Sequence, residues 1–289
     1  MLKKNYFIVL LILLFFIISN NTYARCSRDK DLPLRDIYLT INCINSQQLI
    51  EKITSKSIIL IDARTDTEFN VLKITGAVNI DIDKKQHFIR QIKDIRANDD
   101  REIVFYCNGK RCNLSYRAGQ LAQQIGIKNS TVYDAGIFTF AKIETNKVLL
   151  FNQPISADNK LISPSEYQRH LISLEAFVSD IAAHIENDIP YRILDIRDKA
   201  SHYGSSAFVG IMHERYIPLS KTAKLIKYLK VIARKDIDIY VYDWAGAKLQ
   251  WVQYYLEQQH VKNYFFLKGG AFHKINQELK ANNMPPLPL

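Results

Sequence analysis

Short apolar runs rich in β-branched residues alternate along the chain with stretches of helical periodicity. The runs read "IILID", "IVFY", "RILDI" and "IYVY", and two of the helical stretches span about 114–124 and 249–259. Such alternation is typical of a parallel sheet covered by helices on both faces. The pattern therefore predicts an α/β fold, in which functional groups collect at the carboxyl ends of the strands.

The same unit occurs twice in the sequence. "SIILIDARTDTEF" resembles "YRILDIRDKASHY", and the segment 102–138 resembles 238–272. The second pairing sets Cys107 against Asp243, and the first copy carries two extra residues that we place between the strand end and the following helix. Self-similarity of this kind indicates a repeated structural unit, with a lengthened loop at Cys107.

The repeat divides the chain into a first domain over 25–150 and a second over 160–289. Between the repeats, 142–164 has mixed polarity, two prolines and no clear periodicity, which is typical of a connection. The helical pattern of 165–186 then opens the second domain, and Ser165 is a suitable residue to cap it.

The first residues have the three-part pattern of a secretory signal peptide. Lys3 and Lys4 precede an apolar run over 7–18, and a polar stretch follows that ends at Ala24. We expect 1–24 to be a signal peptide that is cleaved after Ala24, which places the protein in a bacterial periplasm. An uncleaved anchor is the alternative, but the apolar run is short of the ~20 residues that span a bilayer, so we expect no stable membrane anchor.

Export would affect which partners the charged surface can meet and whether the cysteines form disulfides. Lys and Arg number 39 against 29 Asp and Glu, a net charge of +10, and the cations are scattered, so we expect no nucleic-acid partner. A positive field still attracts small anions. Four cysteines in an oxidising compartment allow three pairings. Cys26 and Cys43 lie together in the N-terminal extension, and we expect them to be joined.

The segment "EIVFYCNGKRCNLSYRAGQLA" carries the main candidate chemistry. It places Cys107 between a buried strand and a helix start, where unpaired backbone N–H groups favour an anion. Lys110 and Arg111 add two positive charges, and Gly109 lets the backbone curl so that its amides point inward. Together these features predict a lowered pKa for the Cys107 thiol and a cradle for an anionic sulfur donor.

At this point the two halves resemble tandem rhodanese-like domains, from about 46 to 279. The signs are the strand end "DAR" with "TEF" and "TGAVNI", the cysteine loop before a helix, and the turn "YDAG". The loop "CNGKRC" resembles that of exported bacterial members. The resemblance implies a sulfurtransferase in which Cys107 takes a sulfane sulfur from a donor such as thiosulfate and becomes a persulfide. The cradle would then consist of Asn108, Gly109, Lys110 and Arg111.

Two departures from the family pattern affect the expected activity. The usual loop is shorter, and here Cys112 is inserted before Ser115 as a candidate resolving cysteine. In the second domain Asp243 occupies the position of the nucleophile, and a carboxylate cannot form a persulfide. We therefore expect the second domain to be inactive as a sulfurtransferase.

Several alternatives remain open on the sequence. Cys107 and Cys112 could form a structural disulfide, or cycle as the redox pair of a thiol–disulfide protein, and the chain could be a non-catalytic binding protein. Asp62 and Arg64 fit a buried pair better than a catalytic one. The aromatic positions Trp251, Tyr254 and Tyr255 fit core packing, while Trp244 could help hold a partner.

The expected partners follow from the proposed chemistry. They are a small anionic sulfur donor, a thiol or cyanide acceptor, and a periplasmic protein as a further partner. The histidines show no metal spacing, so we expect neither a metal nor an organic cofactor.

Overall fold

The computed structural model describes residues 26–202, 206–208 and 212–287. The chain divides into two compact units, Met1–Leu149 and Leu150–Leu289. The expected signal peptide, 1–24, lies outside the described residues. Among the described residues, no helix is both long enough and apolar enough to cross a membrane.

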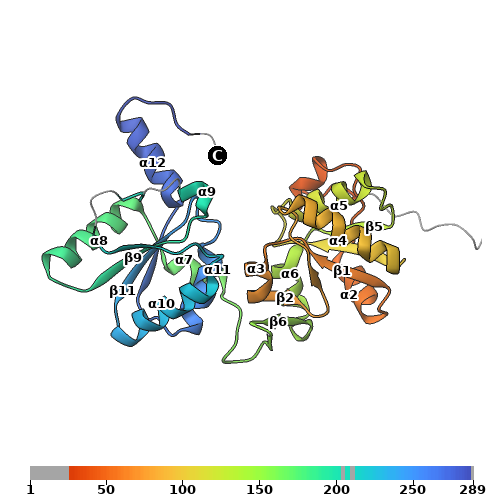
Figure 1. Ribbon diagram of the computed structural model, residues 1–289, viewed down its shortest axis with the longest axis horizontal. Coiled ribbons are helices and arrows are strands. Elements are labelled where there is room, and N and C mark those ends of the chain that lie inside the picture. The colour runs from red at the N-terminus through yellow and green to blue at the C-terminus, as the bar shows by residue number, and fades with distance from the viewer. Residues whose placement is uncertain (1–25, 203–205, 209–211, 288–289) are drawn as a thin grey trace, which may run out of the picture. The chain divides into compact units, whose positions relative to one another are not determined.

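Unit 1 is built on a parallel sheet with the strand order β3-β1-β4-β5. Its strands are β3 (Val78–Asn79), β1 (Ile58–Asp62), β4 (Glu102–Tyr106) and β5 (Ser130–Tyr133). Every residue of β4 and β5 is buried, as expected of parallel strands that are covered on both faces. The predicted α/β class is confirmed, and helices lie on both faces of the sheet (Figure 1).

The helices of unit 1 begin where the sequence offers capping groups. They are α2 (Ser46–Thr54), α3 (Asp66–Val71), α4 (Lys85–Asn98), α5 (Leu114–Gln124) and α6 (Gly136–Ile143), with 3-10 turns at η1 (Pro33–Asp36) and η2 (Thr145–Lys147). Asn45 with Gln48, and Thr65 with Glu68, form capping boxes that start α2 and α3. The capping box of Thr65 and Glu68 follows β1 closely, so it fixes the turn at the carboxyl end of β1.

The N-terminal extension adds a further parallel segment to this sheet. Val132 of β5 donates its N–H to Asn42 O and accepts from Ile44 N, each at 2.9 Å. A disulfide joins Cys26 to Cys43 with a Cα–Cα distance of 4.9 Å, as expected from the sequence. Closing a loop of this length stabilises the fold by about 3 kcal/mol in the chain-entropy view.

Unit 2 has a five-stranded parallel sheet with the order β10-β9-β11-β12-β8. Its strands are β10 (Glu214–Tyr216), β9 (Tyr191–Asp195), β11 (Asp238–Tyr242), β12 (Tyr264–Leu267) and β8 (Leu171–Ile172). The arrangement matches that of unit 1, with β8 in the place of the segment around Cys43. Equivalent loops therefore emerge at equivalent strand ends in the two units.

The helices of unit 2 correct one expectation. They are α7 (Pro164–Arg169), α8 (Leu174–Glu186), α9 (Lys199–His202), α10 (Thr222–Lys235), α11 (Leu249–Gln258) and α12 (Gly270–Ala281). The pattern over 165–186 is two helices separated by β8, and not one helix. The caps are Ser163 and Ser173, whose side chains accept from Glu166 N and Ala176 N, whereas Ser165 lies inside the first turn. Figure 1 shows α8 and α10 on opposite sides of the sheet.

Three short strands form a separate sheet with the order β2-β6-β7: β2 (Leu72–Ile74), β6 (Val148–Leu150) and β7 (Gln153–Pro154). The predicted connection is thus partly regular. Trp251, Tyr254 and Tyr255 of α11 are buried, which confirms their role in core packing.

Candidate active site

The loop at the carboxyl end of β4 brings together two free thiols. Seven residues, 107–113, separate β4 from α5, and six residues, 243–248, separate β11 from α11. The loop of unit 1 is therefore longer, but by one residue. The second extra residue of the repeat lies beyond the loop, where α5 has 11 residues and α11 has 10.

The thiol of Cys107 is enclosed in the protein. Cys107 is fully buried, and its Sγ lies 3.2 Å from Cys112 O and 3.4 Å from Ser115 Oγ. Burial raises the pKa of the Cys107 thiol well above its ordinary value, and a hydrogen bond to the Cys112 side chain adds to this shift. The expected lowering of this pKa is wrong, because loss of solvent outweighs the hydrogen bonds that Ser115 makes with the sulfur.

Cys112 has the more acidic thiol of the pair. Its pKa is lowered to about 7, first by the hydrogen bond from the Cys107 side chain and then by the backbone N–H groups of Leu114 and Asn108. Cys112 is only half-buried and is not part of a disulfide. The loop amides therefore do stabilise a sulfur anion, but the sulfur that they contact is that of Cys112.

Gly136, which lies outside the cysteine loop, allows the start of α6 to pack closely against the loop backbone. Cys112 N donates to Gly109 O at 2.8 Å, which closes a turn inside the loop. Gly109 does not have a positive φ, whereas Gly136 has a φ of +75°. A Cβ on Gly136 would lie 2.3 Å from the Cα of Gly109, and Ile137 N donates to Cys107 O at 2.9 Å. The start of α6 thus packs directly against the cysteine loop.

A buried ion pair braces the other side of the loop. Asp62 and Arg64 are fully buried with their side chains 2.6 Å apart, which confirms their structural role. Arg64 Nη1 donates to Asn108 Oδ1 at 3.1 Å, and Asn108 Nδ2 donates to Glu68 Oε1 at 2.7 Å. The side chain of Asn108 therefore connects the loop to β1 and α3 and does not point into an anion cradle.

The two cations of the loop lie on its exposed side. Lys110 Nζ is 3.8 Å from Asp31 of the N-terminal extension, and the Lys110 side chain is 48% exposed. Arg111 is also exposed. Both remain placed to attract an anion to the loop surface, and what they contribute to substrate binding stays a prediction.

The equivalent loop of unit 2 holds a carboxylate of its own. Asp243 follows β11 and is buried, and it accepts from the backbone N–H of Lys248 at 2.7 Å and from that of Gly246. Burial raises the pKa of Asp243, although these two hydrogen bonds act in the opposite direction. Gly270 repeats the role of Gly136, because a Cβ there would lie 2.6 Å from Asp243 O. Trp244 is half-buried and contacts Phe272.

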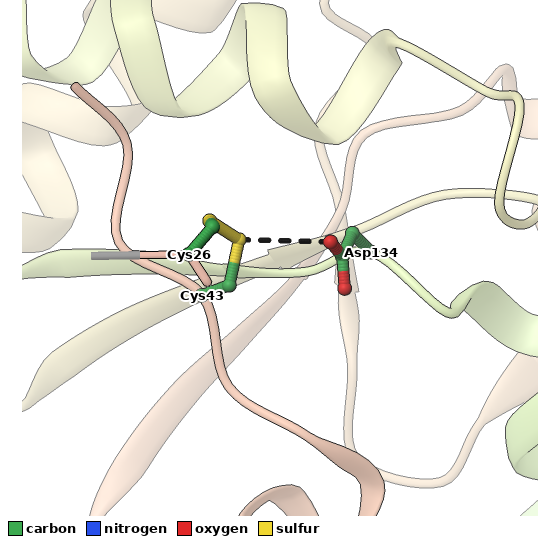
Figure 2. A group of neighbouring side chains, drawn as sticks. All are labelled: Cys26, Cys43 and Asp134. Carbon is green, nitrogen blue, oxygen red and sulfur yellow. Dashed lines mark hydrogen bonds between the residues drawn. A yellow bond between two sulfur atoms is a disulfide. The ribbon is translucent and has the colours of Figure 1, made fainter. Parts of the chain in front are cut away.

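One group of side chains in the described residues has the composition of a metal site. Cys26, Cys43 and Asp134 have ligand atoms within 4.8 Å of one another, and Cys43 Sγ lies 3.6 Å from Asp134 Oδ2 (Figure 2). The two sulfurs are joined to each other. Arg35 donates two hydrogen bonds to the Asp134 carboxylate, at 2.6 and 3.0 Å, and Tyr116 donates a third at 2.6 Å. We therefore assign this group to fastening the extension.

Comparison with known proteins identifies the fold around the loop. Residues 45–143 match the family described as a rhodanese-like domain. The matched region of unit 1 is similar to rhodanese-like domains. It spans α2 to α6 and includes both loop thiols and the Asp62–Arg64 pair.

Two curated relatives share about 30% identity with parts of the chain. They are tRNA uridine(34) hydroxylases of Bacillus pumilus and Staphylococcus saprophyticus, matched over 137 and 129 residues, or 46% and 42% of this chain. The matches cover 42% and 40% of these relatives, so the chain spans about two fifths of their length.

Two of the solved structures that are similar to parts of the chain are sulfurtransferases. A thiosulfate sulfurtransferase of Pseudomonas aeruginosa is 17% identical over 85% of this chain and 43% of its own, with a TM-score of 0.34. A human single-domain sulfurtransferase is 22% identical over 35% of this chain and 95% of its own, with a TM-score of 0.30.

Sequence reasoning gave too little weight to three residues around the rhodanese-like loop. Glu68 holds Asn108, and the spacing of Thr65 and Glu68 in a capping box could have revealed the start of α3. Ser115 contacts the Cys107 sulfur from the first turn of α5. Gly136 fixes the loop backbone, and only its place in the repeated turn with Gly270 pointed to it.

Proposed function

We propose that the protein is a sulfurtransferase that carries sulfane sulfur as a persulfide on Cys107. The observation that carries the proposal is a free cysteine at the carboxyl end of β4, in the loop of a rhodanese-like domain, with no disulfide partner. An anionic donor such as thiosulfate would transfer its outer sulfur to Cys107 and leave as sulfite. A thiol or cyanide would then accept the sulfur.

The loop provides a base for this step. Cys107 Sγ lies 3.2 Å from Cys112 O, and the pKa of the Cys112 thiol is lowered to about 7. A proton that passes along this contact would convert the buried Cys107 into the attacking thiolate. Because Cys107 Sγ is covered, loading also requires residues 108–112 to open.

The test is thiocyanate formation from thiosulfate and cyanide by the purified, reduced and desalted protein. Cys107→Ser should lower turnover by a factor on the order of 10³ or more, because no sulfur nucleophile remains at that position. Asp243→Asn is the matched control and should stay within about twofold of the wild type, since this residue lies in unit 2. Equal turnover by the wild type and Cys107→Ser would contradict the proposal.

A thiol–disulfide redox protein is the second candidate. The contact between the Cys107 and Cys112 thiols favours it, because a dithiol can close reversibly. Cys112→Ser would abolish disulfide reductase activity in that case, whereas it would only slow sulfur transfer through Cys107. A wild type with neither activity would favour a non-catalytic binding protein.

The relatives named as hydroxylases do not change this proposal. Their names describe whole proteins of which this chain covers about two fifths. We therefore do not extend the modification of a tRNA uridine to this chain.

We further propose a tandem protein of the bacterial periplasm, exported through 1–24, with an inactive second rhodanese-like domain. The shared strand order of the two sheets and Asp243 at the nucleophile position support the tandem arrangement. N-terminal sequencing of the mature protein from the periplasmic fraction tests export, and a first residue other than Arg25 would contradict the cleavage site.

A further inference from the structure

The two free thiols belong to neighbouring parts of one loop. Cys107 Sγ lies 3.2 Å from the backbone oxygen of Cys112, and the Cys107 side chain is the main cause of the lowered pKa of Cys112. The turn from Gly109 O to Cys112 N brings the two residues together. Any persulfide on Cys107 would therefore form with a second sulfur nucleophile already beside the sulfur that carries it.

Cys112 has the properties of an attacking thiolate. It is half-buried, whereas Cys107 is fully buried, and the N–H groups of Asn108 and Leu114 point at its sulfur. Its pKa is lowered to about 7, so a large fraction is ionised at neutral pH. A thiolate with a pKa near the ambient pH combines ionisation with nucleophilicity.

We propose that this loop reduces sulfane sulfur to hydrosulfide, with Cys112 as the resolving thiol of the Cys107 persulfide. The proposal rests on the proposed function, because the persulfide has to form first. It adds a second outcome, in which the sulfur leaves as hydrosulfide instead of being passed on.

The two steps balance in atoms and electrons. In the first, the Cys107 thiolate bonds to the outer sulfur of thiosulfate, and the bond to the sulfite group breaks. In the second, the proton that Cys107 gave to Cys112 passes to the outer sulfur of the persulfide, and the Cys112 thiolate attacks Cys107 Sγ. The bond from Cys107 Sγ to the outer sulfur breaks, and its electron pair leaves with hydrosulfide. The two cysteines are oxidised to one disulfide, and the sulfane sulfur gains two electrons. A dithiol reductant returns the loop to its starting state.

Position decides which sulfur Cys112 attacks. Cys112 lies against Cys107 Sγ itself, with its backbone oxygen 3.2 Å away, and this sulfur becomes the inner sulfur of the persulfide. Ser115 Oγ, at 3.4 Å, also contacts that sulfur and helps to hold it in place. Attack within one short loop needs no encounter with a second molecule, so it competes effectively with an external acceptor.

The experiment is a single turnover without oxygen, on the full chain after reduction and desalting. Thiosulfate is added, sulfite and hydrosulfide are measured, and the protein is alkylated and digested with trypsin. Trypsin cuts after Arg101, Lys110, Arg111 and Arg117, so the two thiols fall in separate peptides, 102–110 and 112–117. A Cys107–Cys112 disulfide therefore appears as a cross-link between two peptides.

The wild type should release one equivalent each of sulfite and hydrosulfide per chain and show the cross-link. Cys112→Ser should release sulfite more slowly, because it lacks the base, but should release no hydrosulfide and keep one extra sulfur atom on peptide 102–110. Cys107→Ser should release neither product. The control Asp243→Asn should match the wild type, and loss of hydrosulfide in this control would overturn the proposal.

Failure of the two proposals gives different results. A wild type that releases no sulfite overturns the proposed function, and the resolving step with it. A wild type that releases sulfite but keeps its persulfide, without hydrosulfide or cross-link, overturns the resolving step alone. Hydrosulfide release by Cys112→Ser at the wild-type level would also overturn it.

Discussion

Gly136 packs so closely against Gly109 that a Cβ on Gly136 would lie 2.3 Å from both the Cα and the N of Gly109. The contact joins the first residue of α6 to the middle of the cysteine loop. Ile137 N adds a hydrogen bond to Cys107 O at 2.9 Å. The loop conformation is therefore set partly by a turn some thirty residues further along the chain.

Gly136→Ala should lower both stability and sulfur transfer. The positive φ costs a residue with a Cβ about 1–2 kcal/mol, and the overlap with Gly109 has to be relieved by moving the loop. We expect a lower Tm and a loss of turnover that exceeds the loss of folded protein. Thermal melts and thiocyanate formation measure the two effects.

Gly126→Ala is the matched control. Gly126 has a φ of +89°, and a Cβ there would have no atom within 4 Å, so alanine carries the backbone cost without the overlap. It should lower the Tm and leave turnover per folded molecule unchanged. Equal loss of turnover in both variants would mean that the Gly136 contact does not shape the loop.

Arg64→Ala should destabilise unit 1 strongly. Removing one partner of a buried ion pair leaves Asp62 as an uncompensated charge, at a cost of about 3–5 kcal/mol in the free energy of unfolding. The loop also loses the hydrogen bond from Arg64 to Asn108. Chemical unfolding measures the change, and Arg101→Ala, which removes an exposed ion pair with Asp99, should have little effect. A similar midpoint for both variants would contradict the structural role of Arg64.

The two loop thiols should differ in reactivity toward an alkylating reagent. With a pKa of about 7, Cys112 loses its thiolate as the pH falls through 7, so its alkylation rate should rise with pH and level off above that value. Cys107, with a raised pKa and no exposure, should react much more slowly over the same range. Mass spectrometry of peptides 102–110 and 112–117 reports the two rates separately.

Variants at Cys107 test what lowers the pKa of Cys112. Cys107→Ala removes the thiol that donates to Cys112, so the pKa of Cys112 should rise toward its ordinary value. Cys107→Ser keeps a donor at the same position and should keep more of the shift. An unchanged pH profile in Cys107→Ala would show that the contact between the thiols does not stabilise the anion.

Asp243→Asn should change the pH dependence of stability without changing catalysis. Burial raises the folded-state pKa of Asp243 above the ordinary 3.8, so the folded state favours the protonated carboxyl. The resulting stability is full below the unfolded-state pKa and is lost as the pH rises through the folded-state pKa. Asparagine is neutral throughout, so melts across this pH window should show a flatter profile in the variant. A steeper profile would contradict the direction of the shift.

The fold could be predicted from the sequence because its signals are local. The strand runs and the spacing of 114–124 indicated the parallel sheet and α5, and the Asp-x-Arg strand end indicated the Asp62–Arg64 pair. The prediction of a single helix over 165–186 is wrong because it missed β8, which is only two residues long. A strand that short leaves no alternation to detect.

The candidate site was harder to predict because its electrostatics depend on burial. Lys110 and Arg111 are near Cys107 in sequence, but their exposed positions leave desolvation as the dominant effect on its pKa. The direction of the Asn108 side chain depends on Arg64 and Glu68, which come from β1 and α3. Such contacts between distant segments have no signature in a short motif.

Asp243 makes the second loop an internal reference for the first. Its carboxylate already occupies the amides of Gly246 and Lys248, so a small anion added to the protein finds those two N–H groups taken. Their signals should stay constant in an anion titration, whereas the segment 107–113 has no carboxylate of its own, so we expect its amide signals to respond. A single chain thus contains a responsive loop and a constant one, and the difference between them isolates what the thiols contribute.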